Sequence, residues 1–352
     1  MKDKKFKILS IDGGGMRGII PARILCDLEE ELIKKEGENA RLCDYFDLIC
    51  GTSTGSIIAV GIALGMTVKE ILALYKEHAE DIFPNKSKLA KLYAIFRNKP
   101  FYERKALATY LNNEYNRVTR NKDTRVYHCK TRICIPAYDV DKGEVHVFKT
   151  DHLDKYYKDC HIPAVDVVLS SSAAPVYFYP YSFKYASLGI NDTNWYKNNI
   201  DGGMFANNPT LIGFIEATCC MNIAPEHISI LSLGTGTTNF KVHKKEKYLG
   251  SRFWINPISG SLKVYEAMAS AQSVFIDNLM KVICKGPGQE DLKRVRYVRI
   301  QKELDECIDL DASDEDSIQK LENIGQELYK KYGEIMKPFV SEKIKQYKHH
   351  IN

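Results

Sequence analysis

The sequence predicts an α/β fold in which helices cover both faces of a mainly parallel sheet. Three short apolar segments, 6–11, 45–50 and 227–236, read as buried strands that run directly into turns containing glycine. Segments with apolar residues at helical spacing lie between them, and such alternation indicates parallel pairing of the strands. The chain of 352 residues has no linker rich in Pro, Gly or Ser. We therefore expect a single large domain, with a ligand site beyond the carboxyl ends of the strands.

The N-terminal part contains two predicted strands and three predicted helices. Strand 6–11 is followed by a helix that begins near Pro21, because proline suits the first turn of a helix. Strand 45–50 precedes helices predicted over 56–64 and 68–79 from their apolar spacing.

The later part of the chain contains a hairpin, a buried helix and a long amphipathic helix. Segments 132–140 and 144–150 alternate around a turn with glycine, which predicts a β-hairpin. Segment 165–175 reads as a buried helix that its final proline stops. A capping box starting at Ser313 is expected to open an amphipathic helix that reaches Phe339.

The composition places limits on the partners and the location. Hydrophobic residues make up 44% and charged residues 27% of the chain, as in ordinary globular proteins. The net charge of +5 does not indicate a nucleic-acid polymer as a partner. The ten cysteines include no C-x-x-C pair, which argues against a zinc ribbon. The most apolar stretch, 57–66, is about half of a membrane span. We expect a cytoplasmic protein with peripheral contact to the inner membrane surface.

The first glycine turn follows strand 6–11. Gly13–Gly18 fits G-x-G-x-x-G, a pattern typical of dinucleotide-binding proteins, but the acidic residue expected about twenty positions later is not clearly placed. A nucleotide-binding oxidoreductase and a turn without a ligand both stay open as alternatives. Backbone N–H groups at such a helix N-terminus stabilise an anion placed there.

The second glycine turn contains a candidate nucleophile. Gly51-Thr52-Ser53-Thr54-Gly55 is a G-x-S-x-G sequence between a predicted strand and a predicted helix, the context of a nucleophile elbow. Gly51 and Gly55 let the strand and the helix approach closely, so that the Ser53 hydroxyl projects from the turn. The helix N-terminus behind Ser53 favours developing negative charge.

The third glycine turn offers a base, because the nine histidines include no convincing one. Asp201 precedes Gly202 and Gly203, shortly before a helix expected to begin near Pro209. A carboxylate held there by side-chain amides is able to accept a proton from a serine. The alternative is a turn aspartate or a helix-capping residue.

The three turns together resemble the signature of the patatin-like phospholipases, which are lipid acyl hydrolases. The motifs are IDGGGMRG, GTSTG and DGGMFANNP, and SSSAAPVYF (170–178) and LSLGTG (231–236) resemble that family's secondary motifs. The resemblance implies a three-layer α/β/α sandwich. It covers 6–236, the expected catalytic core, and leaves 237–352 as a mostly helical part packed on the same domain.

The resemblance also implies roles for individual residues. Ser53 would be the nucleophile and Asp201 the base of a Ser–Asp dyad without histidine. The oxyanion hole would be formed by a loop that Arg17 supports: Gly13, Gly14 and Gly15. The reaction would cleave an acyl ester of a phospholipid through an acyl-enzyme, without a metal or cofactor. One departure is Ser56, where many members carry a second glycine.

Three further expectations concern regulation, rival functions and assembly. The chain resembles, less specifically, bacterial members that act as antiviral effectors and that cyclic oligonucleotides activate. A non-catalytic storage or interaction protein on the same fold is the rival function. The oligomeric state is left open between a monomer and a homodimer.

Segment 84–105 is a candidate for contact with the membrane. It carries seven basic residues against one acidic residue, with aromatic and aliphatic residues interleaved. Such a segment is expected to lie on an anionic bilayer surface, although a solvated helix with a packed apolar face has the same composition. The basic residues are Lys86, Lys88, Lys91, Arg97, Lys99, Arg104 and Lys105.

Overall fold

The computed structural model describes residues 5–187, 193–238, 263–285, 295–306 and 308–350. Its main sheet has eight strands in the order β5-β6-β3-β2-β1-β7-β9, with β4 paired to β3 outside this path. A second sheet of two strands pairs β8 (Thr237–Thr238) with β10 (Glu303–Leu304). The strands of the main sheet are β1 (Phe6–Ile11), β2 (Leu48–Gly51), β3 (Arg132–Asp139), β4 (Glu144–Lys149), β5 (Tyr181–Ala186), β6 (Thr193–Asp201), β7 (Ile228–Leu233) and β9 (Arg296–Ile300).

The main sheet is parallel through its centre and antiparallel at one side. The neighbours β3, β2, β1, β7 and β9 pair in parallel, whereas β4, β5 and β6 pair antiparallel. The predicted hairpin is confirmed as β3 and β4. Beyond its pairing with β2, β3 pairs with β6, which brings Asp201 opposite Ala137. The antiparallel strand therefore delivers Asp201 to the same side of the sheet at which β2 ends.

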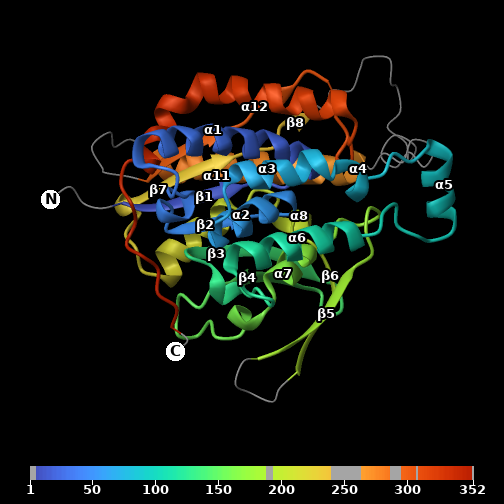
Figure 1. Ribbon diagram of the computed structural model, residues 1–352, viewed down its shortest axis with the longest axis horizontal. Coiled ribbons are helices and arrows are strands. Elements are labelled where there is room, and N and C mark those ends of the chain that lie inside the picture. The colour runs from blue at the N-terminus through green and yellow to red at the C-terminus, as the bar shows by residue number, and fades with distance from the viewer. Residues whose placement is uncertain (1–4, 188–192, 239–262, 286–294, 307, 351–352) are drawn as a thin grey trace.

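Helices cover both faces of the sheet, as the sequence predicts, because alternate strand residues enter two separate cores. Leu9 and Ile11 pack with helices that include α1, α2 and α12, whereas Ile8 packs with α9 and α11. Figure 1 shows α12 lying along α1 on one side of the sheet. The helices are α1 (Ile19–Glu36), α2 (Thr54–Leu64), α3 (Val68–Glu77), α4 (Ala79–Ile82), α5 (Lys88–Phe96), α6 (Lys105–Thr119), α7 (Ala164–Ser171), α8 (Gly203–Ala206), α9 (Thr210–Ile215), α11 (Lys263–Lys285) and α12 (Glu315–Met336).

Two predicted helix ends are wrong, each because of a tertiary contact. Helix α7 ends at Ser171, and the carbonyl groups of Ser171 and Ala173 accept hydrogen bonds from the turn at Asp201 (N···O 3.2 and 3.1 Å). Helix α12 is capped by Asp314, not Ser313, because the Ser313 hydroxyl donates to the carbonyl of Phe83 at 2.7 Å. Neither end is set by the local sequence alone.

The region after 237 contributes a strand to the main sheet as well as helices. Strand β9 pairs with β7 in register Leu231↔Val298, and α12 packs on α1. Within the described residues, no helix is both long enough and apolar enough to cross a membrane.

Candidate active site

The turn between β2 and α2 holds Ser53 in a strained conformation. Its backbone angles are φ 53° and ψ −122°, in a region that residues other than glycine seldom adopt. A Cβ atom at Gly51 would overlap the carbonyl group of Gly55, and one at Gly55 would overlap the carbonyl groups of Ile11 and Asp12. Both glycines are therefore required for the turn to pack against the end of β1.

Hydrogen bonds from distant segments fix the backbone of this turn. The N–H of Ser53 donates to the hydroxyl of Ser171 at 3.1 Å, and that hydroxyl donates to the carbonyl of Pro136 at 2.6 Å. The hydroxyl of Ser56 donates to the carbonyl of Ser53 at 2.6 Å. Ser171 lies in the SSSAAPVYF segment, to which the sequence assigns no contact, and Ser56 acts as a brace within the turn.

The turn after β6 aims Asp201 at the same point. A Cβ atom at Gly202 would overlap the carbonyl group of Pro136, so this turn lies directly against β3. A Cβ atom at Gly203 would lie 2.9 Å from both the Asp201 carboxylate and the Tyr265 hydroxyl. The two glycines therefore give the carboxylate room to approach Ser53 and Tyr265.

Ser53 and Asp201 are in direct contact although they are far apart in the sequence. The Ser53 hydroxyl donates to Asp201 Oδ2 at 2.6 Å, and Asp201 is fully buried. Burial raises the pKa of Asp201 to about 6. Hydrogen bonds from Ser53, from the Gly203 N–H and from Tyr265 act in the opposite direction and limit this rise. The carboxylate is held by a backbone N–H and two hydroxyl groups, so the prediction that side-chain amides hold it is wrong.

The first glycine turn lies beside Ser53 and Asp201, and some of its backbone N–H and carbonyl groups already have hydrogen-bond partners within the protein. The Gly13 N–H donates to the carbonyl of Asn207 at 3.0 Å, and the Thr235 hydroxyl donates to the carbonyl of Gly13 at 2.6 Å. No acceptor among the described residues binds the N–H groups of Gly14 or Gly15. The donors that remain for an anion are therefore those of Gly14 and Gly15, and Gly13 serves to anchor the loop.

All three glycine turns lie within one known family model. The model of the patatin-like phospholipases matches residues 9–214. The chain belongs to the patatin-like phospholipase family. This membership gives the protein a lipid-ester hydrolase fold and argues against the dinucleotide-binding alternative for Gly13–Gly18.

Curated relatives match almost the whole chain. A cGAMP-activated phospholipase of Vibrio cholerae serotype O1 is 30% identical over 339 residues, covering 92% of this chain and 90% of its own length. A second cGAMP-activated phospholipase, from Escherichia coli, is 28% identical and covers 92% of this chain and 88% of its own length. Patatin-like protein 2 of Arabidopsis thaliana is 31% identical over 352 residues, covering 92% and 83% respectively.

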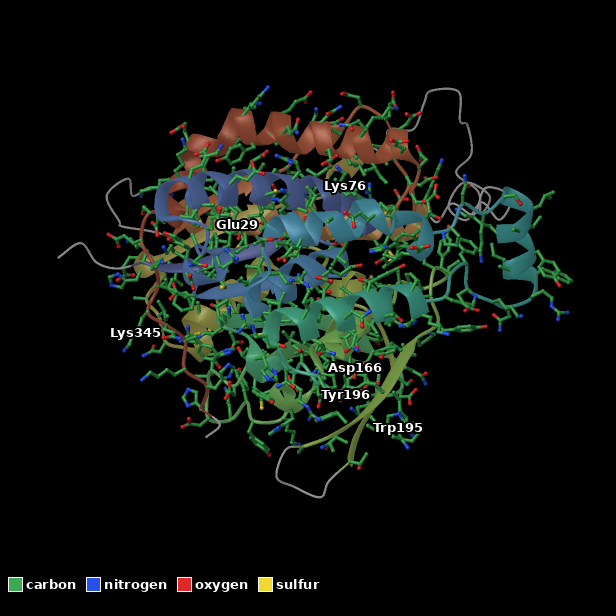
Figure 2. All side chains as sticks on the ribbon, in the orientation of Figure 1. Glu29, Lys76, Asp166, Trp195, Tyr196 and Lys345 are labelled. Carbon is green, nitrogen blue, oxygen red and sulfur yellow. The ribbon has the colours of Figure 1, made fainter. Side chains whose placement is uncertain are left out.

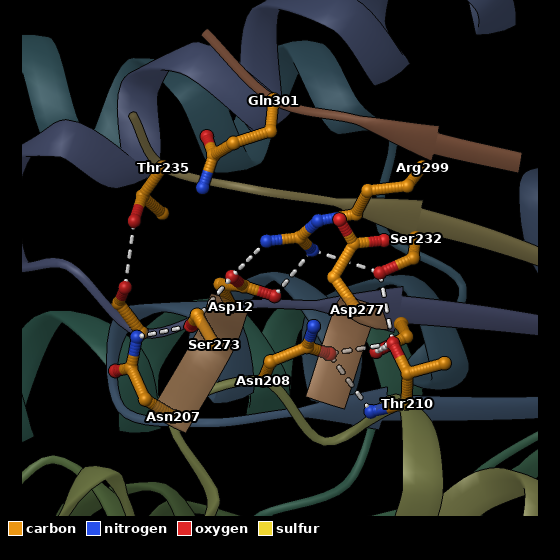
Figure 3. Close-up of polar contacts among 12 residues, drawn as sticks. Asp12, Asn207, Asn208, Thr210, Ser232, Thr235, Ser273, Asp277, Arg299 and Gln301 are labelled. Atoms are coloured by element: carbon orange, nitrogen blue, oxygen red, sulfur yellow. Dashed lines mark hydrogen bonds and ion pairs between the residues drawn. The ribbon is translucent and has the colours of Figure 1, made fainter. Parts of the chain in front are cut away.

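In this patatin-like phospholipase, Asp12 anchors the glycine loop through a buried ion pair that the sequence does not reveal. Figure 3 shows Arg299 and Ser273 converging on the carboxylate of Asp12. The guanidinium of Arg299 donates to both carboxylate oxygens at 2.8 and 2.5 Å, and the Ser273 hydroxyl donates at 3.2 Å. Ser273 also accepts a hydrogen bond from Asn207 Nδ2 at 3.1 Å. The network therefore joins Asp12 to the residue whose carbonyl group anchors Gly13.

A cavity of about 1010 Å³, counted out to open solvent, adjoins Ser53 and has two kinds of wall. Arg17 lines it and is itself buried. Burial raises the pKa of the neighbouring Tyr265 and Glu266, and the charge of Arg17 acts in the opposite direction on both groups. Its polar wall also includes Glu266, Ser270, Ser273 and Gln301. Its apolar wall includes Ile57, Ile82, Phe83, Leu107 and Phe178. The cavity thus matches a molecule with one polar and one apolar part.

None of the described histidines lines this cavity. His152, for example, is buried elsewhere with Thr150 and Glu216, at 2.9 and 3.0 Å from its two ring nitrogens. Within the same part of the chain, no three His, Cys, Asp or Glu side chains group as metal ligands do. The cavity therefore presents Asp201, and no described histidine, to Ser53.

No pattern in the sequence indicates that Tyr265 contacts the active site. We predict that Tyr265 sets the pH dependence of the reaction. Tyr265→Phe removes a hydrogen bond that lowers the pKa of Asp201. Because the base must be deprotonated, the rate rises with pH through the pKa of Asp201, and the variant should require a higher pH. We expect the midpoint of the acidic limb of kcat/KM to move up by about one pH unit.

Tyr102→Phe is the matched control for this prediction. It also removes a buried tyrosine–carboxylate hydrogen bond, from Tyr102 to Asp311 at 2.6 Å, but outside the dyad. A pH profile that shifts equally in both variants, or in neither, would contradict the role of Tyr265.

Proposed function

We propose that this protein cleaves acyl esters of membrane phospholipids with a dyad of Ser53 and Asp201. The observation that carries the proposal is the 2.6 Å hydrogen bond from the Ser53 hydroxyl to the buried Asp201 carboxylate, in a turn with the strain of a nucleophile elbow. The cavity lining includes both polar and apolar side chains, which supports an amphiphilic ester as the substrate.

The reaction proceeds through an acyl-enzyme. Asp201 accepts the Ser53 proton as the oxygen attacks the ester carbonyl carbon, and the carbonyl oxygen becomes an oxyanion. The N–H groups of Gly14 and Gly15 donate to this oxyanion, each worth roughly 3 kcal/mol in such sites. Collapse expels the lysophospholipid alkoxide, which takes the proton from Asp201. Water then gives a proton to Asp201 as its oxygen attacks the acyl carbonyl carbon. The Ser53 oxygen leaves and takes this proton from Asp201, which releases the fatty acid and restores both residues.

The direct experiment is product analysis after incubation with phospholipid vesicles. Wild-type protein should release free fatty acid and lysophospholipid in equal amounts, and Ser53→Ala should release neither. Intact lipid after incubation of folded wild-type protein, with and without cGAMP, would favour the non-catalytic alternative.

We further propose that a cyclic dinucleotide activates the protein. The support is that two relatives, which this chain matches over 92% of its length, are named cGAMP-activated phospholipases. Added cGAMP should raise fatty-acid release by wild-type protein, and mass photometry on the same samples distinguishes a monomer from a homodimer. Full activity without any additive would count against this regulation.

The proposed membrane contact is α5, which projects from the edge of the molecule (Figure 1). Leu89, Tyr93 and Phe96 form a stripe at helical spacing, and Leu89 and Phe96 are 77% and 85% exposed. Apolar side chains this exposed on a projecting helix are typical of segments that insert into a bilayer surface. Helices α4 and α6 flank α5 in the sequence and carry Ile82 and Leu107 of the cavity wall. Docking through α5 therefore brings the cavity close to the inner membrane surface.

The charge count made from the sequence for this segment needs correction. The ammonium group of Lys86 donates to the carbonyl of Phe101 at 2.5 Å, Lys91 pairs with Asp311 at 2.6 Å, and Arg104 is hydrogen-bonded to the carbonyl of Tyr179. These three side chains bind acceptors that the folded protein supplies: a buried carboxylate for Lys91, and backbone carbonyl groups for Lys86 and Arg104. The described basic residues that stay exposed are Lys86, Arg97, Lys99 and Lys105. The apolar stripe is thus the main contribution, and the charge is secondary.

Replacing the stripe tests this contact. Leu89→Ser with Phe96→Ser should lower binding to anionic vesicles at least tenfold in a sedimentation assay, because both side chains lose their transfer into the bilayer. Trp195→Ser is the control, since Trp195 is 52% exposed but lies on the β5–β6 ribbon, far from α5 (Figure 2). Equal losses in both variants, or no loss in the first, would show that α5 is not the docking element.

A further inference from the structure

We propose that Glu266 selects phospholipids whose headgroup carries an ammonium group, as the ethanolamine headgroup does. This inference rests on the proposed function and adds to it the class of headgroup that the cavity accepts. Glu266 lies in the first turn of α11 and lines the same cavity as Ser53. The proposed reaction steps do not use its carboxylate.

The carboxylate of Glu266 is buried without a partner in the protein. The residue is only 8% exposed. None of the described residues forms a hydrogen bond or an ion pair with the carboxylate, and its oxygen atoms retain accessible surface. Because the residue lines the cavity, that surface is available to a bound molecule. A buried carboxylate without a partner is unfavourable, and a ligand that supplies a positive charge with N–H donors relieves this.

The charges around Glu266 are mixed in sign. Burial raises the pKa of its carboxyl group, and the positive charges of Arg17 and Lys263 act in the opposite direction. The negative charges of Asp309 and Asp311 act in the same direction as burial. An ammonium group bound against the carboxylate favours its ionised form and therefore offsets the effect of burial.

The other carboxylates that line the cavity already have partners within the protein. Asp12 is paired with Arg299 at 2.5 Å, and Asp201 accepts the hydrogen bond from the Ser53 hydroxyl at 2.6 Å. Among the described lining residues, Arg17 is the one basic side chain. A headgroup with both charges therefore matches this lining better than a headgroup with negative charge alone.

Ser270 adds a second acceptor for an ammonium group. It lies four residues after Glu266, so both side chains lie on the same face of α11, and both line the cavity. No hydrogen bond within the described residues uses its hydroxyl. An ethanolamine ammonium has three N–H donors, which carboxylate and hydroxyl oxygens accept. A glycerol headgroup has hydroxyl donors but no positive charge, so it leaves the charge of Glu266 uncompensated.

Short-chain lipids test this selection in solution, where docking to a bilayer plays no part. The measured quantity is the ratio of kcat/KM for monomeric dihexanoyl phosphatidylethanolamine to that for dihexanoyl phosphatidylglycerol. In wild-type protein this ratio should be at least ten, the size of effect expected when a charged hydrogen-bond partner is present or absent. Glu266→Gln should bring the ratio close to one, because the amide keeps the size of the side chain and loses its charge.

Glu322→Gln is the matched control. Glu322 is also a buried glutamate on a helix, but it pairs with Lys76 at 2.9 Å and does not line the cavity. The ratio in this variant should equal that of wild-type protein. A negative charge near the start of a helix also stabilises the helix. If that were the whole role of Glu266, Glu266→Gln would lower the melting temperature and leave the ratio unchanged.

Binding to a protein without the nucleophile separates selection from reaction. In calorimetry, Ser53→Ala protein should bind the ethanolamine lipid at least tenfold more tightly than the glycerol lipid, and adding Glu266→Gln should remove the difference. Equal kcat/KM for both lipids in wild-type protein, or a ratio that Glu266→Gln leaves unchanged, would overturn the selection and leave the proposed reaction intact. If neither lipid were hydrolysed and the ethanolamine lipid still bound through Glu266, the proposed reaction would be wrong and the headgroup site would be supported.

Discussion

Replacing Ser53 with alanine is expected to reduce ester hydrolysis to background while leaving the protein folded. The hydroxyl is the one that donates to Asp201 at 2.6 Å, and without it no acyl-enzyme forms. Loss of a nucleophile in comparable enzymes lowers kcat by about 10⁴-fold or more. Alanine tolerates the backbone at φ 53° no worse than serine does, so the melting temperature should change by only a few degrees.

Asp201→Asn should be nearly as damaging, because the amide keeps the shape but does not accept the proton. Histidine variants are the controls for the dyad, measured with the same ester and with circular dichroism. Each should keep most of its activity when replaced by alanine, allowing for any loss of stability: His128, His146, His152, His161 and His227. A folded histidine variant as inactive as Ser53→Ala would show that the reaction uses a triad with that histidine, and not a Ser–Asp dyad.

Replacing Gly14 with alanine is the second substitution with a large expected effect. Its Cβ atom would overlap the side chain of Thr235, whose hydroxyl holds the carbonyl of Gly13 at 2.6 Å. The glycine loop must then shift, and its N–H groups leave the position of the oxyanion. We expect kcat to fall about 10²-fold or more with a smaller change in KM, because the oxyanion exists only near the transition state.

Gly333→Ala is the control for the loop variant. Gly333 lies within α12, where the nearest atom to an added Cβ is 3.4 Å away, so turnover should be unchanged. If Gly14→Ala raised KM and left kcat intact, the loop would contribute to binding the substrate and not to stabilising the oxyanion.

The sequence by itself placed the glycines that the second and third turns require. At Gly51, Gly55 and Gly202 a Cβ atom would overlap neighbouring backbone. The need for glycine at each of these positions is therefore visible in the sequence as the glycine itself. The alternation of apolar strands and helices likewise fixed the parallel centre of the sheet, because buried strands and helices differ in their apolar spacing. Family membership followed from the order of these motifs.

Only the tertiary structure decided which side chains meet at those turns. Tyr265 on Asp201, Ser171 on Ser53 and Arg299 on Asp12 come from distant segments, and no spacing in the chain encodes such contacts. The same holds for Lys91, which the sequence presents as a membrane-facing charge and the fold pairs with Asp311. A side chain's partner depends on which buried acceptor the packed helices bring within hydrogen-bond distance, and that is a property of the whole fold.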